Sequence, residues 1–374
     1  MVEPPPALSD TSGRGSLAIN GSGARVGLDP GPRRAAILPK DHQPLLLVII
    51  DTEEEFDWRL PHRRENTNVT AVAAQWRAQE VFARHGIVPT YVVDYPVASN
   101  LAAVDALAPF AEAGHCRIGA HLHPWVNPPY SETVNAYNSY PGNLPPVLER
   151  EKLAILTETI TSNFGVKPVL YKAGRYGIGP ATAQIIEDLG YRMDASVVPF
   201  TSFSNDGGPD FTGKGFHPTW FGSKGDLLEI PLSCGFYGAL RGAGPMLFPR
   251  LSGAAGMRLR LPGILSRLGV LERIRLTPEG VDLAANMRLA RSLFDQGCRV
   301  FSLTYHSPSL VPGMTPYVKT TQELERFLAT LDRFFQFFRE ELGGRSSEPQ
   351  QIYDTLDRIS ARDKDQGNGV TGRW

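Results

Sequence analysis

Residues 118–125 read Ile-Gly-Ala-His-Leu-His-Pro-Trp, so an apolar run ends in two histidines that are two positions apart. In a β-strand, side chains at positions i and i+2 point to the same face of the sheet. If this run is a strand, His121 and His123 can therefore reach a common point. Catalytic zinc is commonly held by imidazole and carboxylate groups, so this pair is a candidate for part of a metal site.

Two other apolar runs also end in polar side chains. Residues 45–50 are apolar and are followed directly by Asp-Thr-Glu-Glu-Glu at positions 51–55. Far along the chain, residues 300–305 form another apolar run, which ends at His306. Carboxylates from the first run could complete a zinc-type site with the histidine pair.

The remaining sequence alternates short apolar runs with longer amphipathic segments. Strands are predicted at residues 45–50, 88–93, 116–120, 168–171, 191–198, 227–232 and 300–305. Helices are predicted at residues 67–84, 99–113, 148–163, 180–190, 277–296 and 320–342. This alternation indicates parallel strands with right-handed crossovers, and about seven units favour a β/α barrel over an open doubly wound sheet. The carboxyl ends of barrel strands share one side, so Asp51, His121, Asp194 and His306 should converge there.

The composition is that of an ordinary globular protein. The chain has 374 residues, of which 42% are hydrophobic and 21% charged, with a net charge of -1. This balance argues against a general attraction to nucleic acid. The three cysteines are widely spaced and form neither a zinc motif nor a disulfide framework, which suits a reducing compartment. Because neither a membrane-spanning run nor a secretory signal is recognisable, we expect a cytoplasmic protein.

Three regions are predicted along the chain. Residues 1–42 are rich in Pro, Gly, Ser and Arg without apolar periodicity, so we expect a disordered tail. Residues 43–342 form the barrel domain, and residues 343–374 form a polar C-terminal tail, also loosely ordered. Within the barrel, the insert 247–276 has six arginines and one acid, Glu272. It is interpreted as a helical hairpin covering the barrel, although peripheral contact with a membrane surface or binding of an anionic glycan is also compatible with it.

The order of these motifs resembles that of the NodB-type polysaccharide deacetylases, carbohydrate esterase family four. After the acidic segment come His-x-His-Pro at 121–124, Tyr-Lys-Ala-Gly-Arg-Tyr-Gly at 171–177, Leu-Gly-Tyr-Arg-Met-Asp-Ala-Ser at 189–196, and the late strand that ends in histidine. The resemblance covers residues 44–342 and looks closest to the WalW-like branch, which is associated with cell-surface polysaccharide loci. It implies a distorted (β/α)7 barrel with a divalent metal, usually zinc, that removes acetyl groups from N-acetylated sugars.

The resemblance implies that Glu53, His121 and His123 hold the metal. Two departures from the family pattern bear on this assignment. The usual Asp-Asp pair is replaced by the acidic segment 51–55, so the roles of base and ligand could be exchanged within it, and some of these acids could be a solvated charge run. The two histidines are normally four positions apart and are here two apart, a spacing that suits a strand.

The resemblance also implies catalytic roles. Asp51 matches the general base, His306 the general acid, and Asp194 the acid that orients the general acid. The position of the arginine that supports the base falls on Lys172, while Arg175 follows three residues later. Since Lys and Arg are not equivalent in a bidentate contact, both are kept as candidates.

The expected substrate is a saccharide or a glycolipid precursor. Trp58, Trp125 and Tyr176 lie on predicted loops near the motifs and could stack on the apolar face of a sugar ring, or could instead belong to the core. Two other functions stay open. One is a metal-free hydrolase of another C–N bond, and the other is a non-catalytic carbohydrate-binding barrel.

Overall fold

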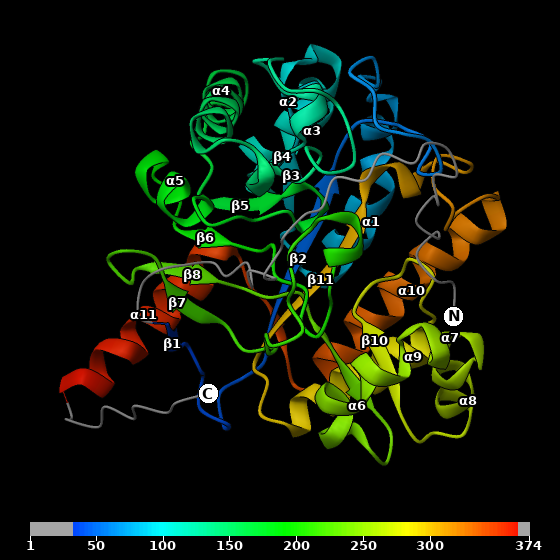
Figure 1. Ribbon diagram of the computed structural model, residues 1–374. Helices are drawn as coiled ribbons and strands as arrows, with labels where there is room; N and C mark the ends of the chain where they lie inside the picture. Colours follow the sequence, from blue (N-terminus) through cyan, green and yellow to red (C-terminus); the bar gives the residue numbers. More distant parts are fainter. Residues whose placement is uncertain (1–32, 366–374) are drawn as a thin grey trace.

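A computed structural model describes residues 33–365 of the chain, and seven parallel strands form its centre (Figure 1). Their order across the sheet is β8-β6-β5-β4-β3-β2-β11. The strands are β2 (Leu45–Thr52), β3 (Thr90–Val93), β4 (Arg117–Leu122), β5 (Leu170–Ala173), β6 (Met193–Asp194), β8 (Leu227–Glu229) and β11 (Val300–His306). The predicted distorted (β/α)7 barrel is confirmed. All seven strands run the same way, so their carboxyl ends lie on one side.

The barrel is closed by side chains where its two edges meet. Antiparallel β7 (Thr219–Phe221) and β1 (Arg34–Ala35) extend the sheet beyond β8. On the other side, the backbone N–H of Ser302 in β11 donates to Ser233 Oγ, and that of Ser233 donates to Ser302 Oγ, each at 2.9 Å. Serine hydroxyls and the backbone of Leu276, which bonds Ser233 and Thr304, thus replace a continuous strand ladder at this seam, which is the distortion of the barrel.

Helices pack around the strands, and several begin and end as their sequences predict. They are α1 (Trp76–His85), α2 (Tyr95–Ser99), α3 (Leu101–Glu112), α4 (Pro146–Phe164), α5 (Thr182–Leu189), α9 (Leu283–Asp295) and α10 (Thr321–Glu340). α10 begins with a capping box in which Thr320 and Glu323 satisfy each other's backbone N–H groups. α1 ends at Gly86, whose left-handed backbone conformation, with φ of 62°, costs glycine little.

Strand β2 lies at the centre of the packing, because all eight of its residues are buried. Leu46, Val48 and Ile50 face the cluster that the surrounding helices complete. The alternate residues of β2 face a second cluster with Leu170, Met193 and Leu228 from other strands. A strand that is apolar on both faces is typical of parallel sheets covered on each side.

The ends of the described chain are more ordered than predicted. Residues 33–42 include β1, and Leu38 is buried in the second cluster. After α10, the chain forms β12 (Arg345–Ser346), which pairs with β2, and α11 (Pro349–Asp365), which contributes Ile352 to the same cluster. The predicted boundaries at 42 and 343 are therefore wrong, since both segments supply apolar residues to the core. The rest of the predicted tails lies outside the described residues.

The arginine-rich insert forms a lobe rather than a hairpin over the barrel. Strands β9 (Cys234–Tyr237) and β10 (Glu272–Arg275) pair antiparallel in a separate sheet. Between them lie three short helices, α6 (Gly244–Leu251), α7 (Ala254–Arg258) and α8 (Leu261–Arg267). Among the described residues, no helix combines the length and the apolar character that a membrane crossing requires.

Candidate metal and catalytic centre

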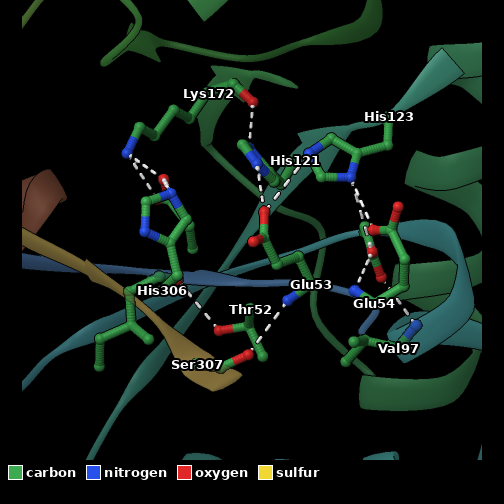
Figure 2. A network of polar contacts seen from close by, with 12 residues as sticks. Thr52, Glu53, Glu54, Val97, His121, His123, Lys172, His306 and Ser307 are labelled. Carbon is green, nitrogen blue, oxygen red and sulfur yellow. Dashed lines mark hydrogen bonds and ion pairs between the residues drawn. The ribbon is translucent and has the colours of Figure 1, made fainter. Parts of the chain in front are cut away.

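The carboxyl ends of β2 and β4 bring three predicted metal ligands together (Figure 2). His121 belongs to β4, His123 follows it directly, and Glu53 follows β2. Glu53 Oε2 lies 3.7 Å from His121 Nε2 and 3.5 Å from His123 Nε2. Two atoms that each lie about 2.0 to 2.2 Å from a tetrahedral ion are about 3.3 to 3.6 Å apart. The donor atoms are thus spaced as ligands of one ion would be.

Hydrogen bonds at the far side of each imidazole fix its orientation. His121 Nδ1 lies 2.9 Å from the backbone carbonyl oxygen of Lys172, and His123 Nδ1 lies 2.7 Å from Glu54 Oε2. Since both of these partners accept, each Nδ1 carries the proton and each Nε2 presents a lone pair toward Glu53. A carboxylate or carbonyl behind a histidine is the usual arrangement for a metal ligand.

The ionisation of Glu53, His121 and His123 favours a bound cation. Burial raises the pKa of Glu53 to about 7 and lowers that of His123 to about 4. Glu53 Oε1 is buried and has no hydrogen-bond partner within the described part of the chain. His306 and His121 act against this rise in the pKa of Glu53 without reversing it, so among the described residues the protein compensates a charge on Glu53 only in part. This donor set fits a divalent ion such as zinc, which takes nitrogen and oxygen ligands.

The acid next along the chain supports this group rather than forming a second site. Glu54 is 0% exposed and accepts from the indole N–H of Trp125 at 2.7 Å. Its backbone N–H donates to Asp94 Oδ2 at 2.7 Å, and Asp94 also caps α2. Glu54, Asp94 and His123 also lie close enough together to hold a metal, but Glu54 already bonds His123 Nδ1 and the indole of Trp125, and Asp94 bonds the backbone N–H groups of Glu54 and Val97. The interpretation of Glu53 and Glu54 as a solvated charge run is wrong, because both are buried.

The predicted base, Asp51, is held by Lys172. The Nζ atom of Lys172 lies 2.5 and 2.6 Å from the two carboxylate oxygens and also donates to Thr304 Oγ1 at 3.1 Å. Burial alone would raise the pKa of Asp51, but Lys172, His121 and His306 together lower it below its usual value. Of the two candidates for the supporting cation, Lys172 is therefore the one in contact with Asp51.

Arg175 contacts residues of a loop instead of Asp51. Its guanidinium donates to Ser139 Oγ, pairs with Asp206 at 3.4 Å and lies 4.1 Å from the ring centre of Tyr140. It therefore holds the loop that follows β4 instead of supporting the base. Among the described residues, Arg175 forms no hydrogen bond or ion pair with Asp51 or His306, so its assignment to the catalytic group is not supported.

The predicted acid, His306, faces Asp51 from the end of the neighbouring strand. β11 and β2 are paired so that His306 stands opposite Asp51, and Nε2 lies 3.6 Å from Asp51 Oδ2. Its partner is Glu279, whose Oε2 accepts from Nδ1 at 2.8 Å and whose Oε1 accepts from the His306 backbone N–H at 3.0 Å. Burial would lower the pKa of His306, but Glu279, Glu53 and Asp51 raise it to about 10. The imidazole is therefore a proton donor at neutral pH.

The assignment of Asp194 as the acid that orients His306 is wrong. Asp194 accepts from the hydroxyl and the backbone N–H of Ser196, at 2.7 and 3.0 Å. It stands opposite Glu229 on β8, and burial raises the pKa of Asp194. Glu279 takes the orienting position instead. The sequence had placed Glu279 inside a helix from residue 277, whereas α9 begins only after its N-cap, Asp282.

Comparisons with known proteins identify the fold. No family model and no curated protein matches the sequence. Among solved structures, a protein from Mycobacterium smegmatis that is provisionally named a polysaccharide deacetylase superposes with a TM-score of 0.51. The two sequences are 16% identical, and the match covers 87% of this chain and 95% of the other. The chain has the NodB-type barrel fold.

Two further solved structures superpose less closely on the chain. A family 4 carbohydrate esterase from Streptomyces lividans, in complex with acetate, has a TM-score of 0.39 at 9% identity over 82% of this chain and 92% of that one. The Bc1960 peptidoglycan N-acetylglucosamine deacetylase has a TM-score of 0.40 at 10% identity over 84% and 90%. Likenesses at this level carry no further conclusion, and the WalW-like branch stays a prediction.

A tight turn after β5 packs against the metal ligands of this NodB-type barrel. A Cβ atom added at Gly174 would lie 2.4 Å from His123 Cδ2 and 2.4 Å from the carbonyl oxygen of Leu122. No side chain fits at that distance, so glycine is required for the imidazole to keep its place. Arg175 and Tyr176 follow with φ of 52° and 61°, a left-handed conformation that residues with side chains adopt at a cost.

Two of the three predicted sugar-stacking aromatics lie beside the catalytic pair. The ring of half-buried Trp58 meets His306 edge-on, with centroids 4.7 Å apart. Tyr176 is also half-buried, and its ring centre lies 5.4 Å from Lys172 Nζ. Trp125 is only 1% exposed, because its ring stacks on His62 and His123 with centroids 4.1 and 4.3 Å away. Its assignment to substrate binding is therefore wrong, and it positions Glu54 instead.

Proposed function

We propose that this protein is a metal-dependent hydrolase that removes acetyl groups from an N-acetylated saccharide. One observation carries the proposal. Two imidazole nitrogens face the same buried carboxylate oxygen, at 3.5 and 3.7 Å, beside an acid that is already ionised. A buried carboxylate that the protein compensates only in part destabilises the fold unless a bound cation completes the compensation, so a purely structural role does not explain this arrangement.

In this proposal Glu53, His121 and His123 hold a divalent ion, for which zinc is the best match because two histidines and a glutamate form a known catalytic zinc set. When bound, the ion would polarise the amide carbonyl and acidify a water molecule. Glu54 and the carbonyl of Lys172 keep both imidazoles in the tautomer that presents Nε2 to the ion.

The other residues move protons. Asp51 is ionised because Lys172 contacts both of its oxygens, so it can accept the proton of the attacking water. The water oxygen forms a bond to the acetyl carbon, and the C–N bond breaks. His306, kept charged by Glu279, donates a proton to the departing amine nitrogen, which yields acetate and a free amino sugar. Asp51 and His306 lie 3.6 Å apart, so both can act on one reacting group.

Metal analysis together with acetate release tests the proposal. Wild-type protein should contain about one divalent ion per chain and release acetate from N-acetylated oligosaccharides, and His121→Ala should lose both. His115→Ala removes an exposed imidazole six residues earlier in the chain and serves as the matched control. Hydrolysis of a C–N bond without metal would favour the metal-free alternative. Metal without hydrolysis, or neither, would favour a binding barrel.

We further propose that the lobe formed by α6, α7 and α8 contacts an anionic membrane surface, where a glycolipid substrate would be found. Met246, Leu259 and Leu268 on this lobe are 62, 64 and 69% exposed. Exposed arginines lie among them, at positions 241, 250, 258, 260 and 267. The sequence has no acidic residue between Glu229 and Glu272. Exposed apolar groups with unbalanced positive charge suit anionic lipids of the cytoplasmic leaflet.

Sedimentation with vesicles tests the lobe. The protein should bind vesicles that contain phosphatidylglycerol and should not bind vesicles of phosphatidylcholine alone. Arg267→Gln should weaken binding about fivefold, because each basic residue near such a surface contributes about 1 kcal/mol. Arg333→Gln removes an exposed arginine from α10 and should have no effect. Equal binding to both vesicles, or to neither, would contradict the proposal.

A further inference from the structure

Arg275 ends strand β10 and lies beside the catalytic group, although it belongs to the insert. The centre of its guanidinium is 5.7 Å from the ring centre of Tyr176, whose other neighbours include Lys172 Nζ at 5.4 Å. Tyr317 is a second aromatic neighbour that interacts with the charge of Arg275. A residue of the insert thus reaches the carboxyl end of the barrel.

Tyr317 links this position to the other side of the catalytic group. Its ring centre lies 5.5 Å from that of Trp58, and Trp58 in turn meets His306 edge-on at 4.7 Å. Arg275 is therefore one aromatic ring away from Lys172 and two rings away from His306. The side chain of His306 is 20% exposed, so a sugar that reaches His306 binds on the side of the barrel where Trp58, Tyr317 and Arg275 follow one another.

The hydrogen-bonding capacity of Arg275 is unused. Across residues 33–365, the side chain of Arg275 has a cation–π contact and electrostatic neighbours but forms no hydrogen bond or ion pair. Two other arginines differ: Arg273 of β10 donates to Thr201, although its Nε is buried without a partner among the described residues, and Arg288 of α9 pairs with Glu272 at 3.0 Å. The side chain of Arg275 is half-buried, and none of its nitrogens is among the described buried atoms that lack a partner, so its five N–H donors stay accessible to a ligand.

Glu279 stabilises the charge of Arg275 but offers it no free hydrogen-bond acceptor. Glu279 interacts with Arg275 electrostatically, but its oxygens are occupied by the backbone and the imidazole of His306 and by the hydroxyl of Ser309 at 2.5 Å. Burial would lower the pKa of Arg275, yet Tyr176, Cys234, Tyr317 and Glu279 together raise it, so the guanidinium stays charged. Within the described chain, the guanidinium of Arg275 therefore has a stable charge but no hydrogen-bond acceptor.

We infer that Arg275 binds an anionic oxygen group of the substrate, a carboxylate or a phosphate, next to the sugar that loses its acetyl group. The inference rests on the proposed function and adds the substrate class. The planar guanidinium matches such groups with two parallel hydrogen bonds. The hydroxyls of Tyr176 and Tyr317, which form no hydrogen bond within the described chain, can donate to the same group.

Kinetics with matched substrates test the inference. The substrates are a neutral N-acetylglucosamine oligosaccharide, an N-acetylated disaccharide with a uronic carboxylate, and an N-acetylhexosamine 1-phosphate. Arg275→Gln should lower kcat/KM for at least one anionic substrate about 10- to 100-fold, the value of a charged hydrogen bond, and leave the neutral substrate within about twofold. The anionic substrate that loses more identifies the source of the charge. Arg275→Lys should recover part of the loss, and Arg333→Gln should match wild type.

Calorimetric binding of the same three compounds separates this inference from the proposed function. His121→Ala, which does not turn over, serves as the background, with and without Arg275→Gln. If wild type releases no acetate but Arg275→Gln weakens the binding of an anionic compound alone, the hydrolase proposal fails and the anion site stands. Equal losses for neutral and anionic compounds, or no loss for any, overturn the anion site, provided that thermal unfolding shows the variant to be folded.

Discussion

Asp51 and Glu53 come from the end of one strand and are equally inaccessible, at 2% and 3% exposed, yet their surroundings are opposite. Lys172 of β5 contacts both oxygens of Asp51, and the pKa of Asp51 falls. Glu53 meets two neutral imidazoles from β4, and burial raises its pKa to about 7. Burial alone therefore does not decide the role of a carboxylate. Lys172 contacts both oxygens of Asp51, whereas among the described residues no lysine or arginine pairs with Glu53, and this difference fits the proposed roles of base and metal ligand.

The largest expected effect separates these two roles directly. Asp51→Asn should lower the rate of acetate release about 10²- to 10⁴-fold, because the proton acceptor is lost. The metal content should stay near wild type. Glu53→Gln should lose metal as well as activity, since a neutral amide is a poor ligand for a divalent ion. Metal analysis of both variants by mass spectrometry checks this, and the opposite pattern would show that base and ligand are exchanged.

A second substitution removes the cation from the base. Lys172→Met should destabilise the protein by about 3 to 5 kcal/mol, because Asp51 is left as an unpaired buried charge. Urea denaturation measures the loss. The double variant Asp51→Asn with Lys172→Met should be more stable than Lys172→Met alone, since neither charge then remains. Lys167→Met, at an exposed lysine, is the control. If the double variant is no more stable than the single one, Lys172 does not act through Asp51.

Loss of Glu54, which orients His123, should lower metal affinity less than loss of a proposed ligand. Glu54→Gln removes the charged acceptor of His123 Nδ1–H and should weaken metal binding about 10- to 100-fold. Competition with a metal chelator measures the affinity. Glu55→Gln alters the next acid, which accepts from Thr70 and Ala71 near α1, and should leave metal affinity unchanged. Equal losses in both variants would mean that the effect comes from the loop and not from His123.

The smallest expected effect is a shift in the pH dependence of activity, set by the proposed general acid His306. The pKa of His306 is raised to about 10, so the imidazole is protonated below that pH and activity should fall as pH rises through it. Glu279→Gln removes a carboxylate that favours the charged form, so the alkaline limb of the kcat profile should move down by about 1 to 3 pH units. Activity well below the new pKa should change less. An unmoved alkaline limb would exclude Glu279 as the group that keeps His306 charged.

Much of this site could be predicted because its strands are strongly apolar and are followed directly by acidic residues or histidines. The i, i+2 spacing of His121 and His123 predicted two imidazoles on one face, and the acid after β2 predicted the third ligand. Glu279 was missed because its loop resembles the first turn of a helix. The N-cap that ends this loop, Asp282, is the signal that could have found it, since its side chain accepts from Ala285 N–H.

Other residues could not be placed because their environment depends on distant parts of the chain. Trp125 was predicted on a loop, either to stack on a sugar or to belong to the core, and the structure buries it between His62 and His123, which no local pattern indicates. The C-terminal helix α11 is polar overall, so its single apolar stripe was underestimated. Ile352 and Leu356 are four residues apart on that stripe and complete the core.

Lys172 serves both sides of the centre with different atoms. Its backbone carbonyl anchors His121, and its side chain holds Asp51. A mutation changes the side chain but leaves the carbonyl in place. An exchange of lysine for arginine at position 172, or the reverse, therefore changes the pKa of Asp51. The hydrogen bond that orients His121 stays the same, because it comes from the backbone.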